Sequence, residues 1–283
     1  MKKNLAPLFL LLFPFVFAGG DLDAQLARGL CWEISHPDLP GSSYLYGTMH
    51  VGDKRAHKFK KSALAAFKGA DAYAMELDPG AVDPMDVLAM MKQPEGKTLE
   101  DMFTPEEWEQ LDAYFLDKYK TSIKTFNEFK PFYVQTIMLQ SSLKNQAGQA
   151  VDMYFYNEAK AANKDVFGLE TVEEQMNAIF SMSEDEQKQM LLDGMEEEVD
   201  PEDAIDAMLK IYKKGDLNKL QEFSEQEDND YGETFDEEVI LKRNHTMAER
   251  LVPLIKEQTV FIGVGALHLP GEEGIINLLR KQG

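Results

Sequence analysis

The chain contains little cysteine and little histidine. Its 283 residues include one cysteine, Cys31, and five histidines. A lone cysteine excludes an intramolecular disulfide, so a hydrophobic core must hold the fold together, and an apolar content of 44% is enough to build one. Because histidines are so few, a histidine motif that occurs twice is informative about function.

Positive charge is also scarce. Lys and Arg number 29 against 50 Asp and Glu, which gives a formal net charge of −21. Nucleic acids and anionic lipid surfaces repel such a protein, and the sequence has no basic stripe, so we expect no nucleic-acid partner. A short basic cluster at residues 54–58 is the exception. It could contact a carboxylate or phosphate of a substrate, or lie in a solvated loop.

Long apolar runs are absent after the first eighteen residues. Residues 1–18 resemble a cleavable signal peptide, because Lys2 and Lys3 precede a short apolar segment at 5–17. An uncleaved anchor is the alternative. We therefore expect a bacterial periplasmic or secreted protein without a stable membrane anchor, in which residues 19–283 form a single domain.

Two common catalytic motifs are missing. The chain has no H-E-x-x-H, which excludes a helix-based zinc peptidase, and no G-x-S-x-G, which argues against a serine hydrolase. It has instead one short motif twice, GTMH at 47–50 and GALH at 265–268. Each copy ends an apolar segment, and each is followed by an aliphatic residue, a glycine and a carboxylate. The matched flanks indicate a shared role.

The repeated motif predicts one site assembled from both ends of the chain. In α/β sheets, ligands bind beyond the carboxyl ends of the strands. A glycine at a strand end permits a positive φ and a close approach of the backbone to a ligand. Imidazole is the commonest metal ligand and a proton carrier near neutral pH. We therefore predict His50 and His268 as metal ligands, with Gly47 and Gly265 contacting substrate.

Carboxylates and an arginine complete the predicted site. Glu76 ends an apolar strand, and because an unpaired buried carboxylate is costly, we expect it to be a metal ligand, a general base or a salt-bridged structural residue. Glu170, at another strand end, is a second candidate base or a solvated acid. Arg243 and Asn244, on a long predicted helix, could bind substrate or orient a carboxylate, and Arg243 could stabilise an oxyanion.

Hydrophobic patterning predicts an α/β fold with a central mixed sheet. A large helical and acidic insertion, about 83–256, separates most of the predicted strands from the second motif. Thr104 and Thr171 each precede a glutamate three residues later, which predicts two capping boxes and two helix starts. Strands are expected at 29–35, 44–47, 72–77, 164–170 and 260–264.

The two motifs and several other segments resemble the TraB/GumN family, which includes the animal Tiki proteins. These segments are AMELD at 74–78, GLETVEEQ at 168–175, RNHTMA at 243–248 and the closing GVGALHLPGEEGIINLLRKQG. The resemblance covers roughly residues 28–283. It implies an α/β fold of two related halves, each with a strand that ends in GxxH. From the Tiki relatives it also implies a peptidase that uses a divalent metal such as manganese or cobalt.

The leading hypothesis is an exported metal-dependent hydrolase that acts on a peptide or small-molecule substrate. The ligand set suits Mn, Co, Fe or Zn without selecting one. The alternative is a non-catalytic protein of the same fold that binds haem, a metal or a peptide, although a haem binder would favour an apolar pocket over carboxylates around its histidine. In a third reading, the GxxH loops only cap the sheet. The substrate and the oligomeric state, monomer or dimer, stay open at this stage.

Overall fold

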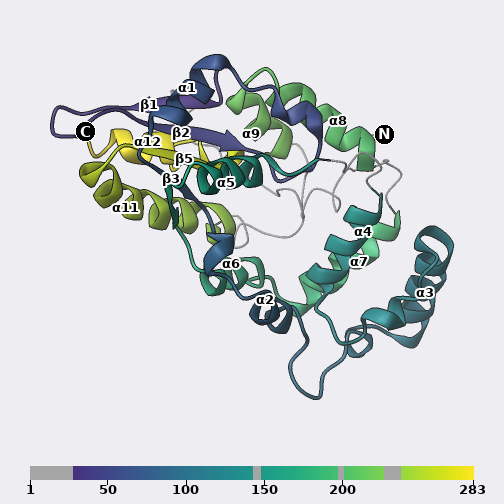
Figure 1. The fold of residues 1–283 in the computed structure, drawn as a ribbon. Coiled ribbons are helices and arrows are strands. Elements are labelled where there is room, and N and C mark those ends of the chain that lie inside the picture. Colours follow the sequence, from purple (N-terminus) through teal and green to yellow (C-terminus); the bar gives the residue numbers. More distant parts are fainter. Residues whose placement is uncertain (1–27, 143–147, 197–200, 226–236) are drawn as a thin grey trace.

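The computed structural model describes residues 28–142, 148–196, 201–225 and 237–283 (Figure 1). The predicted signal segment and three stretches of the helical and acidic insertion, 143–147, 197–200 and 226–236, therefore lie outside the described residues. Within the described ranges, no helix is both long enough and apolar enough to cross a membrane.

A five-stranded mixed sheet forms the centre of the described part of the chain, in the order β1-β2-β5-β3-β4. The edge strand β1 (Cys31–Ile34) runs antiparallel to β2 (Ser43–Thr48). From there β5 (Val260–Gly265), β3 (Ala72–Met75) and β4 (Asp165–Gly168) follow in parallel. The predicted α/β class and mixed sheet are confirmed.

The strands that carry the two GxxH motifs are direct neighbours. β2 pairs with β5 in parallel, with Gly47 opposite Val264 and Thr48 opposite Gly265. Because parallel strands end on the same side of a sheet, this pairing delivers both histidine motifs to one edge. The pairing of β2 with β5 thus places the two motifs, which are far apart in the sequence, side by side.

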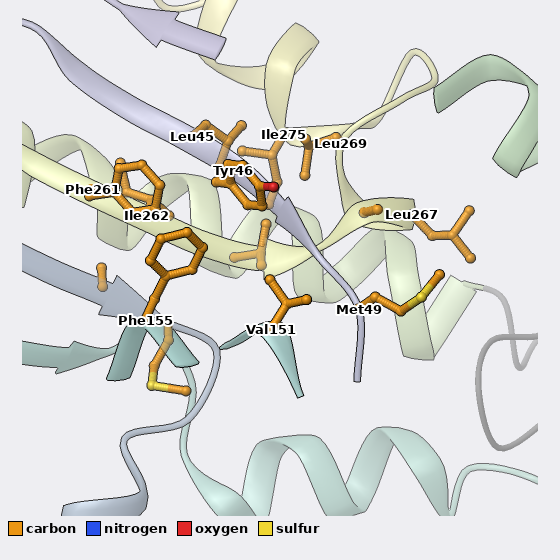
Figure 2. Packing of buried hydrophobic residues seen from close by; sticks show 14 of the residues in the cluster. Leu45, Tyr46, Met49, Val151, Phe155, Phe261, Ile262, Leu267, Leu269 and Ile275 are labelled. Atoms are coloured by element: carbon orange, nitrogen blue, oxygen red, sulfur yellow. The ribbon is translucent and has the colours of Figure 1, made fainter. Parts of the chain in front are cut away.

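Aromatic side chains fill the core on one face of the sheet. Phe155, from helix α5 (Val151–Ala161), packs over strands β2 and β5, with ring centroids 5.2 Å from Tyr46 and 4.9 Å from Phe261 (Figure 2). All three rings are buried. This packing fixes α5 across the sheet, with its first turn at the carboxyl ends of the strands.

The remaining helices surround this sheet or extend from it. Thr104 and Thr171 cap α3 and α6 in the two predicted capping boxes. A short π-helical turn, Glu237–Leu241, precedes α11, where the sequence predicts one long helix. The helices are α1 (Lys61–Gly69), α2 (Pro84–Met90), α3 (Pro105–Tyr119), α4 (Pro131–Ser142), α6 (Val172–Ile179), α7 (Glu184–Glu196), α8 (Pro201–Tyr212), α9 (Leu217–Glu225), α11 (Lys242–Glu257) and α12 (Ile275–Arg280).

The helical insertion has a hydrophobic cluster of its own. Trp108, Leu111 and Phe115 of α3 are buried against Val134 of α4 and Leu191 of α7. The aromatic and aliphatic stripe of α3 is therefore core, as its helical spacing predicts. Figure 1 shows α3 well away from the sheet, so this cluster adds no side chain to the edge where the motifs lie.

Gly47 lies directly against the second motif. A Cβ at this position would lie 3.1 Å from both Cα and Cβ of Ala266 and 3.3 Å from Leu269 Cδ2. We expect Gly47→Ala to lower the free energy of unfolding by about 1–3 kcal/mol, because backbone atoms of the second motif must move. Urea unfolding measures the change.

Gly69→Ala is the matched control, since a Cβ at the end of α1 meets no atom within 4 Å. We expect its free energy of unfolding to stay within about 0.5 kcal/mol of wild type. Equal stability of the two variants would contradict the tight contact between the motifs.

Candidate functional site

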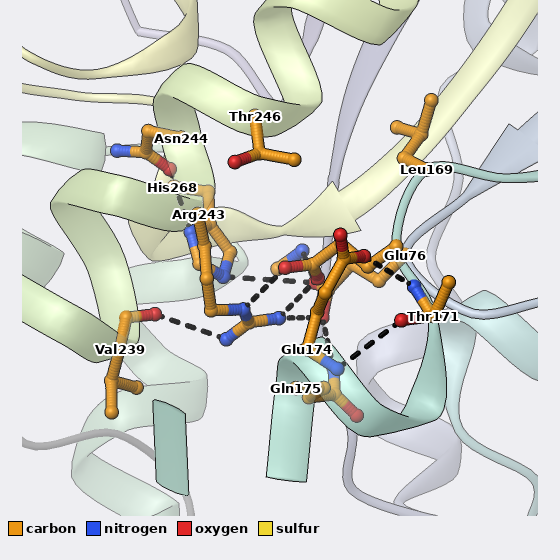
Figure 3. A network of polar contacts seen from close by, with 12 residues as sticks. Glu76, Leu169, Thr171, Glu174, Gln175, Val239, Arg243, Asn244, Thr246 and His268 are labelled. Atoms are coloured by element: carbon orange, nitrogen blue, oxygen red, sulfur yellow. Dashed lines mark hydrogen bonds and ion pairs between the residues drawn. The ribbon is translucent and has the colours of Figure 1, made fainter. Parts of the chain in front are cut away.

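The carboxyl edge of the sheet gathers the predicted site residues. His50 follows β2, Glu76 follows β3, Glu170 follows β4 and His268 follows β5. The first turn of helix α11 lies at this edge and directs Arg243 and Asn244 toward it (Figure 3). The structure thus brings together six residues from five separate segments of the sequence: His50, Glu76, Glu170, Arg243, Asn244 and His268.

One oxygen of Glu76 is the meeting point of both motifs. Oε1 accepts a hydrogen bond from the backbone N–H of Gly265 at 2.7 Å. It also lies 3.5 Å from Nε2 of His50 and 3.8 Å from Nε2 of His268. Burial alone would raise the pKa of Glu76, but His50, and after it His268 and Arg243, hold it well below its usual range. Glu76 is therefore an ionised, buried carboxylate.

The other oxygen of Glu76 belongs to a buried ion-pair network (Figure 3). Arg243 donates from Nη2 to Glu76 Oε2 at 2.9 Å, and to Glu170 through Nε at 2.8 Å and Nη2 at 2.7 Å. Its Nη1 donates to the carbonyl of Val239 at 3.0 Å. Gln175 adds a hydrogen bond of 3.3 Å to Glu76 Oε2. Arg243 thus bridges two carboxylates, and both oxygens of Glu170 accept from it.

His268 is fully buried and presents a bare nitrogen. Its Nδ1 lies 2.7 Å from Oδ1 of Asn244, whose amide nitrogen donates to the carbonyl of Glu273 at 2.8 Å. Because the amide nitrogen is used there, Nδ1 of His268 carries the proton. Burial, followed by Arg243, lowers the pKa of His268 to about 3, so the ring is neutral. Its Nε2 is buried and has no hydrogen-bond partner in the described part of the chain.

His50 lies between two carboxylates, and one of them was missed by the sequence analysis. Its Nε2 faces Glu76, and its Nδ1 lies 3.4 Å from Oδ2 of Asp152. Burial would lower the pKa of His50, but Asp152 and then Glu76 outweigh it and raise the pKa well above its usual range. Asp152 stands in the first turn of α5, where an acid is the ordinary helix preference, so its sequence carries no distinguishing signal.

A cavity of about 180 Å³ opens beside these groups. Its polar wall consists of His50, Glu76, Asp152 and Gln175. Its lining also includes the apolar residues Met75, Leu77, Pro79 and Met153. The cavity can therefore admit a small polar group next to His50 and Glu76 while an apolar portion contacts these apolar side chains.

The donors of this edge fit a divalent cation. Across the described ranges, no three His, Cys, Asp or Glu side chains are already grouped as a complete cation site. Oε1 of Glu76 lies 3.5 Å from Nε2 of His50 and 3.8 Å from Nε2 of His268. Imidazole nitrogens and carboxylate oxygens are donors that divalent cations such as zinc bind in proteins, so these three side chains would hold the cation. The bare Nε2 of His268 supplies the lone pair that such a site needs.

The two predicted substrate-binding glycines have backbone roles in this structure. Gly265 has φ −50° and gives its N–H to Glu76, and Gly47 stays within β2 and accepts a hydrogen bond of 2.8 Å from the hydroxyl of Tyr212. Neither takes a positive φ. In the basic cluster, Arg55 pairs with Asp53 and Asp206 rather than lying free for a ligand.

The sequence of the chain matches a known family over most of its length. The family model described as the TraB/PrgY/gumN family matches residues 30–283. The chain belongs to the TraB/PrgY/gumN family. The family resemblance of the motif segments is thereby confirmed, and the GxxH histidines and Glu76 lie within the matched range.

Relatives of this family member are distant in sequence. It is 24% identical to Metalloprotease TIKI1 of Danio rerio, over 89% of this chain and 61% of the relative. It is 23% identical to Metalloprotease TIKI2 of Xenopus tropicalis, over 85% of this chain and 56% of the relative. An uncharacterized protein of Treponema pallidum (strain Nichols) is 22% identical over 89% of this chain and 80% of the relative. No solved structure is significantly similar. The chain spans less than two thirds of the TIKI proteins.

Proposed function

We propose that this protein is a metal-dependent hydrolase that cleaves peptide or similar bonds, with His50, Glu76 and His268 as the cation ligands. The observation that carries the proposal is the buried, unpartnered Nε2 of His268, which faces the same Glu76 oxygen as His50 does. The names of the TIKI relatives support a metalloprotease at low identity. The identity of the cation among Mn, Co, Fe and Zn is left to experiment.

Several residues of the chain would have separate roles at such a metal site. A divalent cation bound there would polarise a carbonyl oxygen and lower the pKa of water. Asn244 holds His268 in the tautomer with a bare Nε2, and Gly265 and Arg243 fix the carboxylate of Glu76. Glu170 neutralises Arg243 with both oxygens, so in this proposal it supports the site and does not take a proton.

The cavity favours a small cation over haem as the bound group. Its volume is about 180 Å³, whereas sites for drug-sized ligands occupy about 300–1,000 Å³. The lining next to His50 also carries the carboxylates of Glu76 and Asp152, whereas the haem macrocycle would need a larger, apolar pocket. A peptide substrate would therefore present only one or two atoms to the cation, with the rest of it lying outside the cavity.

We also propose that the protein is exported, on the strength of the sequence pattern of residues 1–18. That segment lies outside the described residues. An exported hydrolase of this charge would meet its substrate in the periplasm or the medium, and its acidic surface would repel anionic substrates.

A peptide-cleavage screen tests the proposed activity. Purified protein is incubated with a peptide library and Mn²⁺, Co²⁺, Fe²⁺ or Zn²⁺, and the products are identified by mass spectrometry. We expect cleavage that EDTA abolishes, that added cation restores, and that falls at least 100-fold in His268→Ala. The control is His36→Gln, since His36 is an exposed histidine in the turn between β1 and β2.

Two results would count against the hydrolase. Cleavage that survives both EDTA and His268→Ala would place the activity elsewhere in the chain or in a contaminant. Binding of cation or peptide without any cleavage would support the non-catalytic alternative of the same fold.

A further inference from the structure

The two motif histidines are held in matching ways. On one side, Nδ1 of His268 meets Oδ1 of Asn244 at 2.7 Å, and Nε2 faces Oε1 of Glu76 at 3.8 Å. On the other side, Nδ1 of His50 lies 3.4 Å from Oδ2 of Asp152, and Nε2 faces the same Glu76 oxygen at 3.5 Å. Asp152 therefore lies next to Nδ1 of His50 in the same way that Asn244 lies next to Nδ1 of His268.

The backbone fixes Asp152 in this position. Val151 donates from its backbone N–H to the carbonyl of Met49 at 3.1 Å, which ties the start of α5 to the residue before His50. The hydroxyl of Tyr73 donates to the carbonyl of Asp152 itself at 3.3 Å. The side chain of Asp152 is 14% exposed and forms part of the cavity wall. Its carboxylate thus has little freedom to turn away from the imidazole.

A contribution to stability alone does not explain why the carboxylate of Asp152 is held at this position. Its second oxygen, Oδ1, is buried and has no hydrogen-bond partner in the described part of the chain. A buried carboxylate oxygen without a donor costs free energy, and such exceptions call for a functional explanation. By contrast, Asp53 at the neighbouring loop satisfies both oxygens with Arg55.

We propose that Asp152 is a positioning residue for His50. Its Oδ2, 3.4 Å from Nδ1 of His50, attracts the Nδ1–H and keeps Nε2 directed at the cation site, as Oδ1 of Asn244 does at 2.7 Å behind His268. This inference rests on the proposed function, because it presupposes that His50 is a ligand. Acceptors behind metal-bound imidazoles contribute roughly 10–100-fold to metal affinity.

Cobalt affinity of three variants tests the role. Co²⁺ is titrated against a competing chelator, and its visible absorption reports the bound ion. We expect the dissociation constant to rise about 10–100-fold in Asp152→Ala. Asp152→Asn keeps an acceptor and copies the Asn244 arrangement, so it should stay within about fivefold of wild type. Glu158→Gln, which removes one exposed charge from the same helix, should leave the affinity unchanged.

Two outcomes of the titration would overturn the proposal. The first is an Asp152→Ala protein that binds Co²⁺ as tightly as wild type. The second is an Asp152→Asn protein as weak as Asp152→Ala, which would show that charge, and not a hydrogen-bond acceptor, acts on the cation. Urea unfolding in EDTA identifies an Asp152→Ala protein that is simply misfolded, and Asp152→Asn then decides the question.

Failure of the hydrolase proposal is distinguishable from failure of this one. If the chain binds Co²⁺ but cleaves nothing, the affinity series still decides the role of Asp152. If wild type binds no cation, the contact is measured in the metal-free protein through the Nδ1–H proton resonance of His50, assigned by its loss in His50→Gln. A resonance retained in Asp152→Asn and lost in Asp152→Ala supports the positioning role, and one that is equal in all variants overturns it.

Discussion

Protein purified without chelator is expected to carry close to one divalent cation per chain, and the His50→Ala/His268→Ala double variant to carry none. Both imidazoles face one oxygen of Glu76, so the two substitutions remove two of the three proposed donors at once. One carboxylate oxygen, already bonded to the N–H of Gly265, cannot hold a cation against water. Plasma mass spectrometry for Mn, Fe, Co and Zn gives the content directly.

The matched control removes two histidines that lie outside the cavity. In His36→Gln/His245→Gln both original side chains are exposed, and that of His245 pairs with Glu273. We expect this variant to keep the wild-type metal content. The wild-type protein is also incubated with each cation and passed through gel filtration. If it then contains no metal, the proposed metal site is wrong. Absorption near about 400 nm would then direct attention to haem.

Arg243→Met is expected to lower the free energy of unfolding by about 3–5 kcal/mol, measured in EDTA by urea denaturation. Arg243 bridges Glu76 and Glu170, and all three side chains are at least nine-tenths buried. Methionine fills much of the volume but removes the guanidinium that Glu76 and Glu170 share, so that Glu76 keeps only His50 as a nearby counter-charge. Those carboxyls would then have raised pKa values, so the loss is largest near neutral pH and narrows as the pH falls and they take up protons.

Arg250→Met is the control for this prediction, because Arg250 lies on the same helix and pairs with Glu174 at 2.6 Å where both side chains are about 40% exposed. An exposed pair contributes about 0–1 kcal/mol, so its loss should be small. The double variant Arg243→Met/Glu170→Gln removes one of the unpaired charges and should recover part of the stability. Equal losses in Arg243→Met and Arg250→Met would show that the buried network adds nothing.

Local pattern predicted the elements of this fold better than their arrangement. The strands around Tyr46, Tyr73 and Phe261 are short apolar runs bounded by turn residues, and each lies where the sequence places it. The capping boxes at Thr104 and Thr171 are local as well, since four consecutive residues determine each of them. The order β1-β2-β5-β3-β4 is different, because it depends on which faces pack together over the whole chain.

The same distinction separates the site residues that the sequence could predict from those it could not. Glu76 was predictable because an acid at the end of an apolar strand is costly unless it has a partner. The sequence predicted Glu170 as a candidate general base and Arg243 as a residue that binds substrate or an oxyanion. In the structure the two side chains instead form an ion pair with each other. Asp152 looked like an ordinary first-turn acid until the packing of Phe155 placed its helix over the sheet.

The sequence by itself determined that two GxxH motifs end two strands, and that carboxylates follow two others. Strand propensity, turn residues and matched flanks are properties of a few consecutive residues, so they can be recognised without knowledge of the tertiary structure. Only the tertiary structure decided that β2 and β5 pair, that one Glu76 oxygen faces both imidazoles, and that Asp152 and Asn244 stand behind them. Those contacts join residues far apart along the chain, and they form only when burial of the common core brings the strand ends to one edge.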